Sequence, residues 1–203
     1  MRLRNWITAS ALSLAIATPA LADIAVLAGN APGSLDTVTL SDDLVDFVID
    51  GLVGPDDTAL TITGSENLVL QGQSIEAQTG TFNFLLFTLT DPGAAFTAAE
   101  FNLDAVASGP VSIFAYDQFG DGFGGVFALS EVGSNFFNVA ATNGQIIRSI
   151  VIMSTAALAD VSQIRLGGIT TALVPEPGVW AMMIAGFGGV GLSLRTRRRL
   201  AAA

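Results

Sequence analysis

A glycine-rich loop near the middle of this 203-residue chain holds the side chains best placed to do chemistry. Residues 116–125 read YDQFGDGFGG, and they include Asp117 and Asp121. Calcium takes about six to eight oxygen ligands, and glycines let a loop fold tightly enough for its carbonyl oxygens to join the set. Asp117, Asp121 and the Gly120 carbonyl would supply part of it. We therefore expect either a calcium site at Asp117 and Asp121 or a glycine-rich hairpin turn with two solvated aspartates.

This loop is similar to the DxxGDG loops of several secreted β-sandwich proteins, in which aspartates and backbone oxygens sometimes hold calcium. It does not have the spacing of an EF-hand. Counted from Asp117, the third position is Phe119 and the twelfth is Ala128, where a bidentate Glu belongs. The calcium hypothesis therefore depends on the fold of this loop alone.

Two pairs of adjacent aspartates, Asp42 with Asp43 and Asp56 with Asp57, are candidates for glycoside hydrolysis. That reaction needs two carboxyl groups facing each other across a cleft, about 5–10 Å apart. Adjacent residues of an extended strand point to opposite faces, so neither pair forms such a site by itself. A hydrolase stays open as a third alternative.

The composition argues against an enzyme, because the chain contains no His, no Cys and no Lys. The commonest general base near neutral pH, thiol chemistry and Schiff-base chemistry are therefore absent. Without Cys there is also no disulfide framework. We expect a protein that is not an enzyme.

The charges are separated along the chain. All eighteen acidic residues fall from Asp23 to Glu176, and only Arg148 and Arg165 lie among them. A surface this acidic repels nucleic acid, because phosphate binding needs Lys and Arg. We therefore expect no nucleic-acid partner, and we expect Arg165 to pair with a carboxylate rather than with a ligand.

Short apolar or alternating runs separated by turn residues predict an all-β body over residues 23–172. In Phe82–Leu89 both alternating sets of residues are largely apolar, so this strand is expected to be covered on both faces. Ser154–Val161 is expected to form one helical turn. So many short strands favour a single antiparallel β-sandwich, jelly-roll-like. Strands are expected near residues 24–28, 37–40, 44–49, 59–63, 67–70, 82–90, 101–104, 111–116, 125–130, 136–140, 145–153 and 163–170.

The first residues have the three parts of a secretory signal peptide. Arg2 and Arg4 form a positive start, residues 7–17 form an apolar core, and Ala20 and Ala22 provide the small residues of a cleavage site. We expect residues 1–22 to be a signal peptide and the mature chain to begin at Asp23. The alternative is an uncleaved membrane helix or a buried helix.

The other end combines an apolar run with a basic cluster. Residues 178–194 carry no charge, and as a helix they would span about 25 Å, slightly less than the hydrocarbon core of a bilayer. Trp180 suits one interface of the membrane, and a basic cluster suits the cytoplasmic side. We expect a transmembrane helix at 178–194, against the alternative of a helix in a soluble core. The basic cluster consists of Arg195, Arg197, Arg198 and Arg199.

Residues 173–203 contain Pro175-Glu176-Pro177, then WAMMI from Trp180, then GFG and the arginine cluster. In this order the tail resembles the PEP-CTERM sorting signal, in its PEPxxWAMM variant. The resemblance implies export by a Gram-negative bacterium, retention in the inner membrane and processing near the tripeptide by exosortase, a membrane-embedded cysteine transpeptidase-like enzyme. Pro175, Glu176 and Pro177 would be recognised as a substrate, and two prolines keep such a segment out of a helix and accessible.

Many proteins with this signal occur alongside exopolysaccharide production. We therefore expect an exported, non-enzymatic cell-surface or extracellular-matrix protein, with exosortase as a partner and exopolysaccharide as a further candidate. Its ectodomain would lie in the periplasm while the tail is anchored, and at the cell surface or outside the cell after processing. The alternative is a calcium-dependent carbohydrate-binding, lectin-like module.

Overall fold

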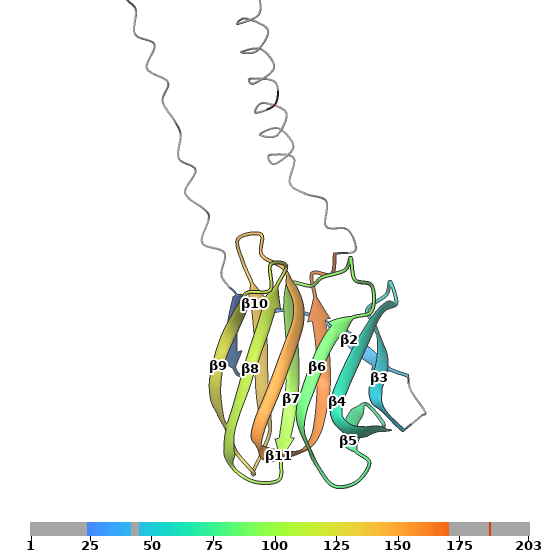
Figure 1. Ribbon diagram of the computed structural model, residues 1–203, viewed down its shortest axis with the longest axis vertical. Coiled ribbons are helices and arrows are strands. Elements are labelled where there is room, and N and C mark those ends of the chain that lie inside the picture. The colour runs from blue at the N-terminus through green and yellow to red at the C-terminus, as the bar shows by residue number, and fades with distance from the viewer. Residues whose placement is uncertain (1–23, 42–44, 171–186, 188–203) are drawn as a thin grey trace, which may run out of the picture.

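The computed structural model describes residues 24–41, residues 45–170 and the single residue Phe187 (Figure 1). The described body consists of strands joined by turns and loops. These strands are β1 Ile24–Ala28, β2 Asp36–Leu40, β3 Asp46–Val53, β4 Thr58–Gln71, β5 Ser74–Ala77, β6 Phe82–Leu89, β7 Ala98–Ala105, β8 Gly109–Asp117, β9 Gly122–Leu129, β10 Asn135–Ala141 and β11 Ile147–Gly167.

Hydrogen bonds join these strands into one eleven-stranded sheet, and every pairing between the strands of the described body is antiparallel. The main path runs β1-β10-β7-β11-β2-β3-β4-β5. Off this path, β6 pairs with β11 and β4, and β8 pairs with β11 and β9. The all-β, antiparallel prediction is confirmed. The prediction of a jelly-roll-like β-sandwich is not confirmed, because hydrogen bonds link all eleven described strands into one continuous sheet.

Strand β11 gives the sheet its shape. Its first part, residues 147–154, pairs with β6 and β8, whereas residues 158–167 pair with β7. The two ends of β11 lie at the same end of the molecule, because Phe96 pairs with the first residue of β11 and the neighbouring Ala95 pairs with Thr170. The strand must therefore bend back in its middle, and it carries the sheet from one layer of Figure 1 to the other.

Aromatic side chains connect the layers through the core. The ring centroid of Phe87 on β6 lies 5.5 Å from that of Phe101 on β7. Phe101 contacts Phe137 on β10 at 6.1 Å, and Phe137 contacts Phe127 on β9 at 5.4 Å. Edge-to-face and tilted pairs at these distances are favourable for aromatic rings. A single core therefore holds the first part of the sheet against the second.

Most predicted strands fall within observed ones, but their lengths differ. The segments near 59–63 and 67–70 are parts of one strand, β4, and those near 145–153 and 163–170 are both parts of β11. The helical turn expected at Ser154–Val161 is wrong, because this segment is the bend of β11. Its alanines and Leu158 favour a helix locally, but hydrogen bonds to β6 and β7 at Leu158 and to β7 at Asp160 override that preference. Strand β5 was not predicted.

The two ends of the described body lie close together. Ile24 pairs with Ala141, whose N–H donates to the carbonyl of Thr97. Thr97 in turn donates its N–H to the carbonyl of Gly167, the last residue of β11. The chain therefore enters and leaves the body at the same end of the sheet, as Figure 1 shows.

The predicted signal peptide, residues 1–22, lies outside the described residues. So does the predicted tail, residues 173–203, apart from Phe187. Within the part of the chain that the structure describes, no helical segment has the length and apolarity that crossing a bilayer requires. The transmembrane helix at 178–194 therefore stays a prediction.

Candidate functional site

The glycine-rich loop is the hairpin that joins β8 to β9. Asp117 ends β8 and is 3% exposed. Its Oδ1 accepts hydrogen bonds from the backbone N–H groups of Phe119 at 2.8 Å and Asp121 at 2.9 Å. Its backbone N–H donates to the carbonyl of Asp121, and its carbonyl accepts from Gly120. An aspartate that bonds the backbone two residues ahead mimics a turn, so Asp117 closes this hairpin.

Both residues of the predicted calcium site therefore belong to one short loop. Asp121 is exposed, and Gly120 has φ 86°, a conformation that glycine adopts without steric strain. Among residues 24–41 and 45–170, no group of three acidic side chains gathers closely enough to hold a metal ion. Hydrogen bonding accounts for the position of Asp117, and the calcium site stays a prediction.

The aspartate pairs give no comparable arrangement. Asp56 and Asp57 lie in the exposed turn between β3 and β4, and Asp57 has φ 50°. Asp56 lines a surface depression together with Asp36 of β2. Asp42 and Asp43 lie outside the described residues.

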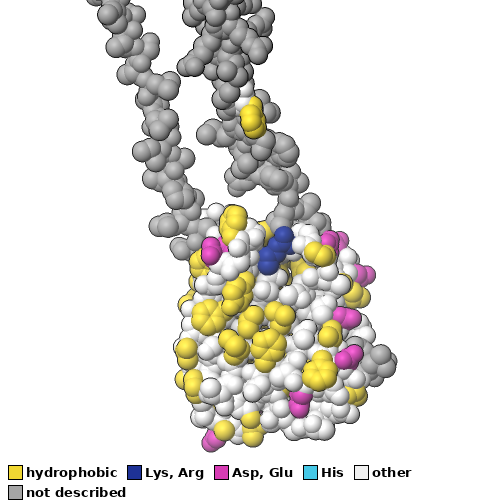
Figure 2. Space-filling view, in the orientation of Figure 1, with side chains coloured by type: hydrophobic (Ala, Val, Ile, Leu, Met, Phe, Trp, Pro, Cys, Tyr) yellow, Lys and Arg dark blue, Asp and Glu magenta, His cyan; other side chains and the backbone are white. Residues whose placement is uncertain are grey.

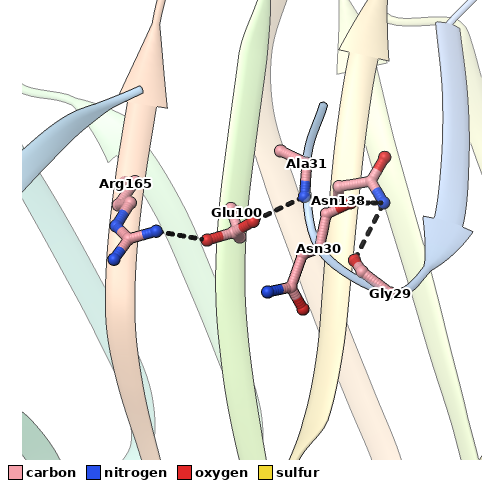
Figure 3. Close-up of polar contacts among 6 residues, drawn as sticks. All are labelled: Gly29, Asn30, Ala31, Glu100, Asn138 and Arg165. Atoms are coloured by element: carbon pink, nitrogen blue, oxygen red, sulfur yellow. Dashed lines mark hydrogen bonds and ion pairs between the residues drawn. The ribbon is translucent and has the colours of Figure 1, made fainter. Parts of the chain in front are cut away.

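Arg165 pairs with a carboxylate, as predicted. Its Nη1 lies 2.8 Å from Oε1 of Glu100, directly across the ladder between β11 and β7 (Figure 3). Glu100 is 2% exposed, and its other carboxylate oxygen accepts the backbone N–H of Ala31. Asn138, next to Glu100 on β10, donates to the carbonyls of Gly29 at 2.8 Å and Asn30 at 3.4 Å. These contacts hold the segment after β1 against the sheet, which is a structural role.

A row of three carboxylates crosses the sheet where β11 enters its second part. Asp160 lies opposite Asp104 of β7 and opposite Glu76 of β5. Burial raises the pKa of the Asp160 carboxyl above its ordinary value of 3.8, and the charges of Asp104 and Glu76 raise this pKa further. A hydrogen bond with Ser162 acts in the opposite direction. Like charges directly opposite one another destabilise a sheet, so the row stores unfavourable electrostatic energy at neutral pH.

An uncharged surface covers the outward side of β6, the first part of β11, β8 and β9. Figure 2 shows apolar side chains gathered in this region of the visible face. The strand register places its residues in three rows across the strands, and we call these residues the outer face. The rows are Phe84, Met153, Ser112 and Val126; then Leu86, Val151, Phe114 and Gly124; then Thr88, Ser149, Tyr116 and Gly122.

The outer face is partly open to solvent. Along β8, Ile113 and Ala115 are fully buried, whereas Phe114 and Tyr116 between and after them are partly exposed. At the margins of the face, Val126 is 69% exposed. The strand Phe82–Leu89, which was expected to be covered on both faces, is covered by described residues on only one, because Phe84 and Leu86 stay partly exposed. An apolar surface therefore lacks a covering element within the described body.

The hydroxyl groups of the outer face make no hydrogen bonds to other described residues. Within the described body, the side chains of Thr88, Ser112, Ser149 and Tyr116 have no hydrogen-bond partner. The ring of Tyr116 lies against Gly122, because a Cβ built at Gly122 would approach Tyr116 Cε1 to 3.0 Å. With glycines opposite both Tyr116 and Phe114, no side chain of β9 covers these two rings.

The residues expected to direct sorting lie outside the described part of the chain, as do Ala20 and Ala22 of the predicted cleavage site. They are Pro175, Glu176, Pro177, Trp180, Arg195, Arg197, Arg198 and Arg199. Their roles are supported by sequence similarity and not by geometry.

Fold and composition together define an antiparallel all-β body with an acidic surface, followed by an apolar and basic tail. Residues 173–199 of that tail match the family model described as the PEP-CTERM protein-sorting motif. The chain thus carries a PEP-CTERM sorting motif, which confirms the resemblance drawn from Pro175 onward. The motif implies a secreted protein that is held in a membrane and then processed through an exosortase-type pathway.

No curated protein matches the chain. Among solved structures, the enzymatically active domain of tailspike protein 4 from bacteriophage CBA120 is 14% identical, with a TM-score of 0.29; the match covers 72% of this chain and 19% of that one. Two mutants of CBM29-2, a family 29 carbohydrate binding module, are 12% and 13% identical with TM-scores of 0.26, and one was complexed with cellulohexaose. These matches cover 72% of this chain and 92% of the modules. Similarity this low carries no conclusion about a ligand.

The outer face is not evident from the sequence alone. The available signal was the double apolar pattern of Phe82–Leu89, which was interpreted as burial on both sides. What the sequence could not show is that β8 and the first part of β11 place their outward residues beside that strand.

Proposed function

We propose that this chain is an exported, non-enzymatic protein of the cell surface or extracellular matrix, and that its body has a jelly-roll-like sandwich fold. The observation that carries the proposal is the match of residues 173–199 to the PEP-CTERM sorting motif. The predicted signal peptide at residues 1–22 supports the same route, because it would start the export that the tail completes.

The route has three stages. The signal peptide directs export and is removed after Ala22, the helix at 178–194 holds the chain in the inner membrane, and exosortase processes it near Pro175-Glu176-Pro177. The geometry of the body is compatible with a tether at one end, since the chain enters near Ile24 and leaves near Thr170 at the same end of the sheet. The rest of the body then projects away from the membrane.

The composition supports a non-enzymatic role. With no His, Cys or Lys, acid–base catalysis would depend mainly on carboxyl groups, and the candidate pair Asp56 and Asp57 lies in an exposed turn. The outer face carries no titratable group other than the Tyr116 phenol. A binding or structural role needs no catalytic side chain, and the sheet presents one uncharged face for it.

Replacing Pro175, Glu176 and Pro177 together by alanine tests the sorting role. In a host that contains exosortase, the variant should accumulate as a larger, membrane-held species, detected by immunoblotting of membrane and released fractions. The same comparison in a host without exosortase is the control, because there both proteins should remain large and membrane-held. An unchanged size distribution in the first host would refute processing at this motif.

A calcium-dependent carbohydrate-binding module is the second candidate, with calcium at Asp117 and Asp121. It is favoured by the observation that one short hairpin loop contains both aspartates, with the backbone N–H of Asp121 bonded to Oδ1 of Asp117. A ligand that binds only the folded chain must raise its melting temperature. Calcium should therefore raise the melting temperature of the full chain above its value in EDTA, and the Asp121→Asn variant should lose this shift. Equal melting temperatures with calcium and with EDTA would remove this candidate.

A further inference from the structure

We infer that the outer face binds an uncharged polysaccharide. The inference names a partner for the proposed surface or matrix protein, and it rests on that function only for placing the body outside the cell. It is distinct from the calcium-dependent candidate, because it uses the outward side of β6, β11, β8 and β9 and no metal.

The chemistry of the outer face matches that of a sugar ring. A pyranose presents C–H groups on its two sides and hydroxyl groups around its rim. The outer face offers the partly exposed rings of Phe84, Phe114 and Tyr116 for the C–H groups. Hydroxyls that can both donate and accept stand among these rings, at Ser112 and Ser149, and have no partner within the described body. An aromatic ring with a polar tip, such as that of Tyr116, serves both needs.

The charge distribution selects an uncharged partner. The three rows contain no Asp, Glu, Lys or Arg. The described body as a whole has two arginines and many more acidic residues, so its net charge is negative. An acidic polysaccharide or an anionic membrane would be repelled by the net negative charge of the body, although Arg148 lies next to Ser149 at one end of the face. A second copy of this chain would bring two acidic bodies together, which opposes self-association through the same face. A neutral polymer meets no such repulsion.

The dimensions suit a polymer rather than a single sugar. Each row crosses four strands, and strands lie about 4.8 Å apart, so a row is about 14 Å long. Three rows two residues apart cover about 14 Å along the strands. Gly122 and Gly124 remove side chains from β9, which leaves Tyr116 and Phe114 open toward the edge of the sheet. A chain of several sugars can therefore lie across the strands and continue past that edge.

The test is affinity electrophoresis of the full chain in native gels. The protein is kept in a polyoxyethylene detergent, because a detergent with a sugar head group would compete. The gels contain one of three neutral polysaccharides (dextran, galactomannan or a mixed-linkage β-glucan) or the acidic polysaccharide alginate. At least one neutral polysaccharide should retard the chain, equally in calcium and in EDTA, and alginate should not.

Two kinds of variant locate the site. Phe114→Ser and Tyr116→Ser should each weaken binding about tenfold, the ratio that corresponds to 1.4 kcal/mol. Ser112→Asp removes nothing from the core, yet it should abolish retardation because it places a charge in the middle of the face. The matched controls are Phe47→Ser, at a 50% exposed phenylalanine of β3, and Ser134→Asp, in the exposed loop before β10. Both should bind as the parent does, and thermal unfolding checks that every variant is folded.

Three results would overturn the inference. The first is a folded parent chain that no neutral polysaccharide retards. The second is retardation that Ser112→Asp and the two aromatic variants leave unchanged. The third is a concentration-dependent dimer, seen by sedimentation velocity, that Ser112→Asp dissociates, since the face would then belong to a second copy. None of these results depends on residues 175–177, so the sorting experiment succeeds or fails independently.

Discussion

Asp117 illustrates how an environment decides what a residue does. By type and spacing it is a candidate calcium ligand, but in the folded chain one of its oxygens accepts two backbone N–H groups of its own hairpin. Such bonds to a carboxylate are among the stronger hydrogen bonds in proteins. Any cation at this loop would have to bind through the remaining oxygen of Asp117, Asp121 and backbone carbonyls.

Glu100 and Arg165 show the same principle with the opposite outcome. A scarce arginine among many acids was expected to pair with a carboxylate, and it does so at 2.8 Å. The sequence could not identify Glu100 as the partner, because the two residues are brought together only by the register of β7 against β11. Nor could it show that Glu100 would also bind the N–H of Ala31.

Asp160 provides a prediction of pH dependence. Its pKa in the folded state is raised, so the folded chain holds this proton more tightly than the unfolded chain. The contribution of Asp160 to stability is therefore favourable at low pH and is lost as the pH rises through the raised pKa. Asp160→Asn removes the ionised form, so the variant should be more stable than the parent at pH 7, and this advantage should shrink toward pH 4.

Urea unfolding of the full chain at several pH values measures this difference. Glu131→Gln is the matched control, because it removes one negative charge from the exposed loop after β9. Its effect should stay small and nearly constant over the same range. An Asp160→Asn variant that is less stable than the parent at pH 7 would contradict the proposed repulsion by Asp104 and Glu76.

Strand β11 is the element that local patterns describe least well. Its two parts were predicted as separate strands with a helical turn between them, yet the backbone continues in a single strand of 21 residues. Register shifts occur between Leu158 and Asp160 and between Ser162 and Arg165, and Gln163 has φ 53°. Such irregularities bend a strand and change which side chains face the core. They arise from pairing with distant strands, so no local pattern reveals them.

The β8–β9 hairpin makes a prediction about close packing. A Cβ at Gly124 would lie 1.9 Å from the carbonyl oxygen of Ile113, whereas a Cβ at the neighbouring Gly125 would meet nothing within 4 Å. Gly124→Ala must therefore move β9 away from β8, and we expect it to destabilise the chain by about 1–3 kcal/mol. Gly125→Ala should change stability by less than about 0.5 kcal/mol. Chemical unfolding of the two variants tests this, and equal stabilities would show that β9 does not approach β8 this closely.

The whole molecule depends on the aromatic contacts that join its two layers. Phe101 is fully buried and contacts Phe87 of one layer and Phe137 of the other. Phe101→Ala should lower the free energy of unfolding by about 3–5 kcal/mol. Because both layers share this core, far-UV and near-UV circular dichroism should report one coincident transition.

The control for this substitution is Phe119→Ala, since Phe119 lies at the hairpin tip and is 77% exposed. It should change stability by less than about 0.5 kcal/mol. Separate transitions for the two probes in the parent chain would mean that the layers unfold independently, which would contradict a single shared core.

At the scale of the whole molecule, sorting and binding are expected to occupy different places. The chain enters and leaves the body at one end of the sheet, near Thr97. The outer face lies on the side of the sheet, across β6, β11, β8 and β9. A body tethered through its tail can therefore leave this face free for a partner.

The features that depend on residues close together in the chain could be predicted without a fold. These are the PEP-CTERM motif at 173–199, the preference for strands, and the acidic character of the body. Each follows from local spacing or composition, and none needs a neighbour from another strand. The sorting motif is recognised as a linear segment, which is why it could be identified without a fold.

Which distant residues meet depends on the folded sheet. It paired Arg165 with Glu100, bent β11 back on itself, and aligned Leu86, Val151 and Phe114 in one uncharged row. The physical reason is register, because a shift of one residue between two strands turns every side chain of a strand to the other face. Register is set by the packing of the whole sheet, and the short-range pattern of a single strand does not contain it.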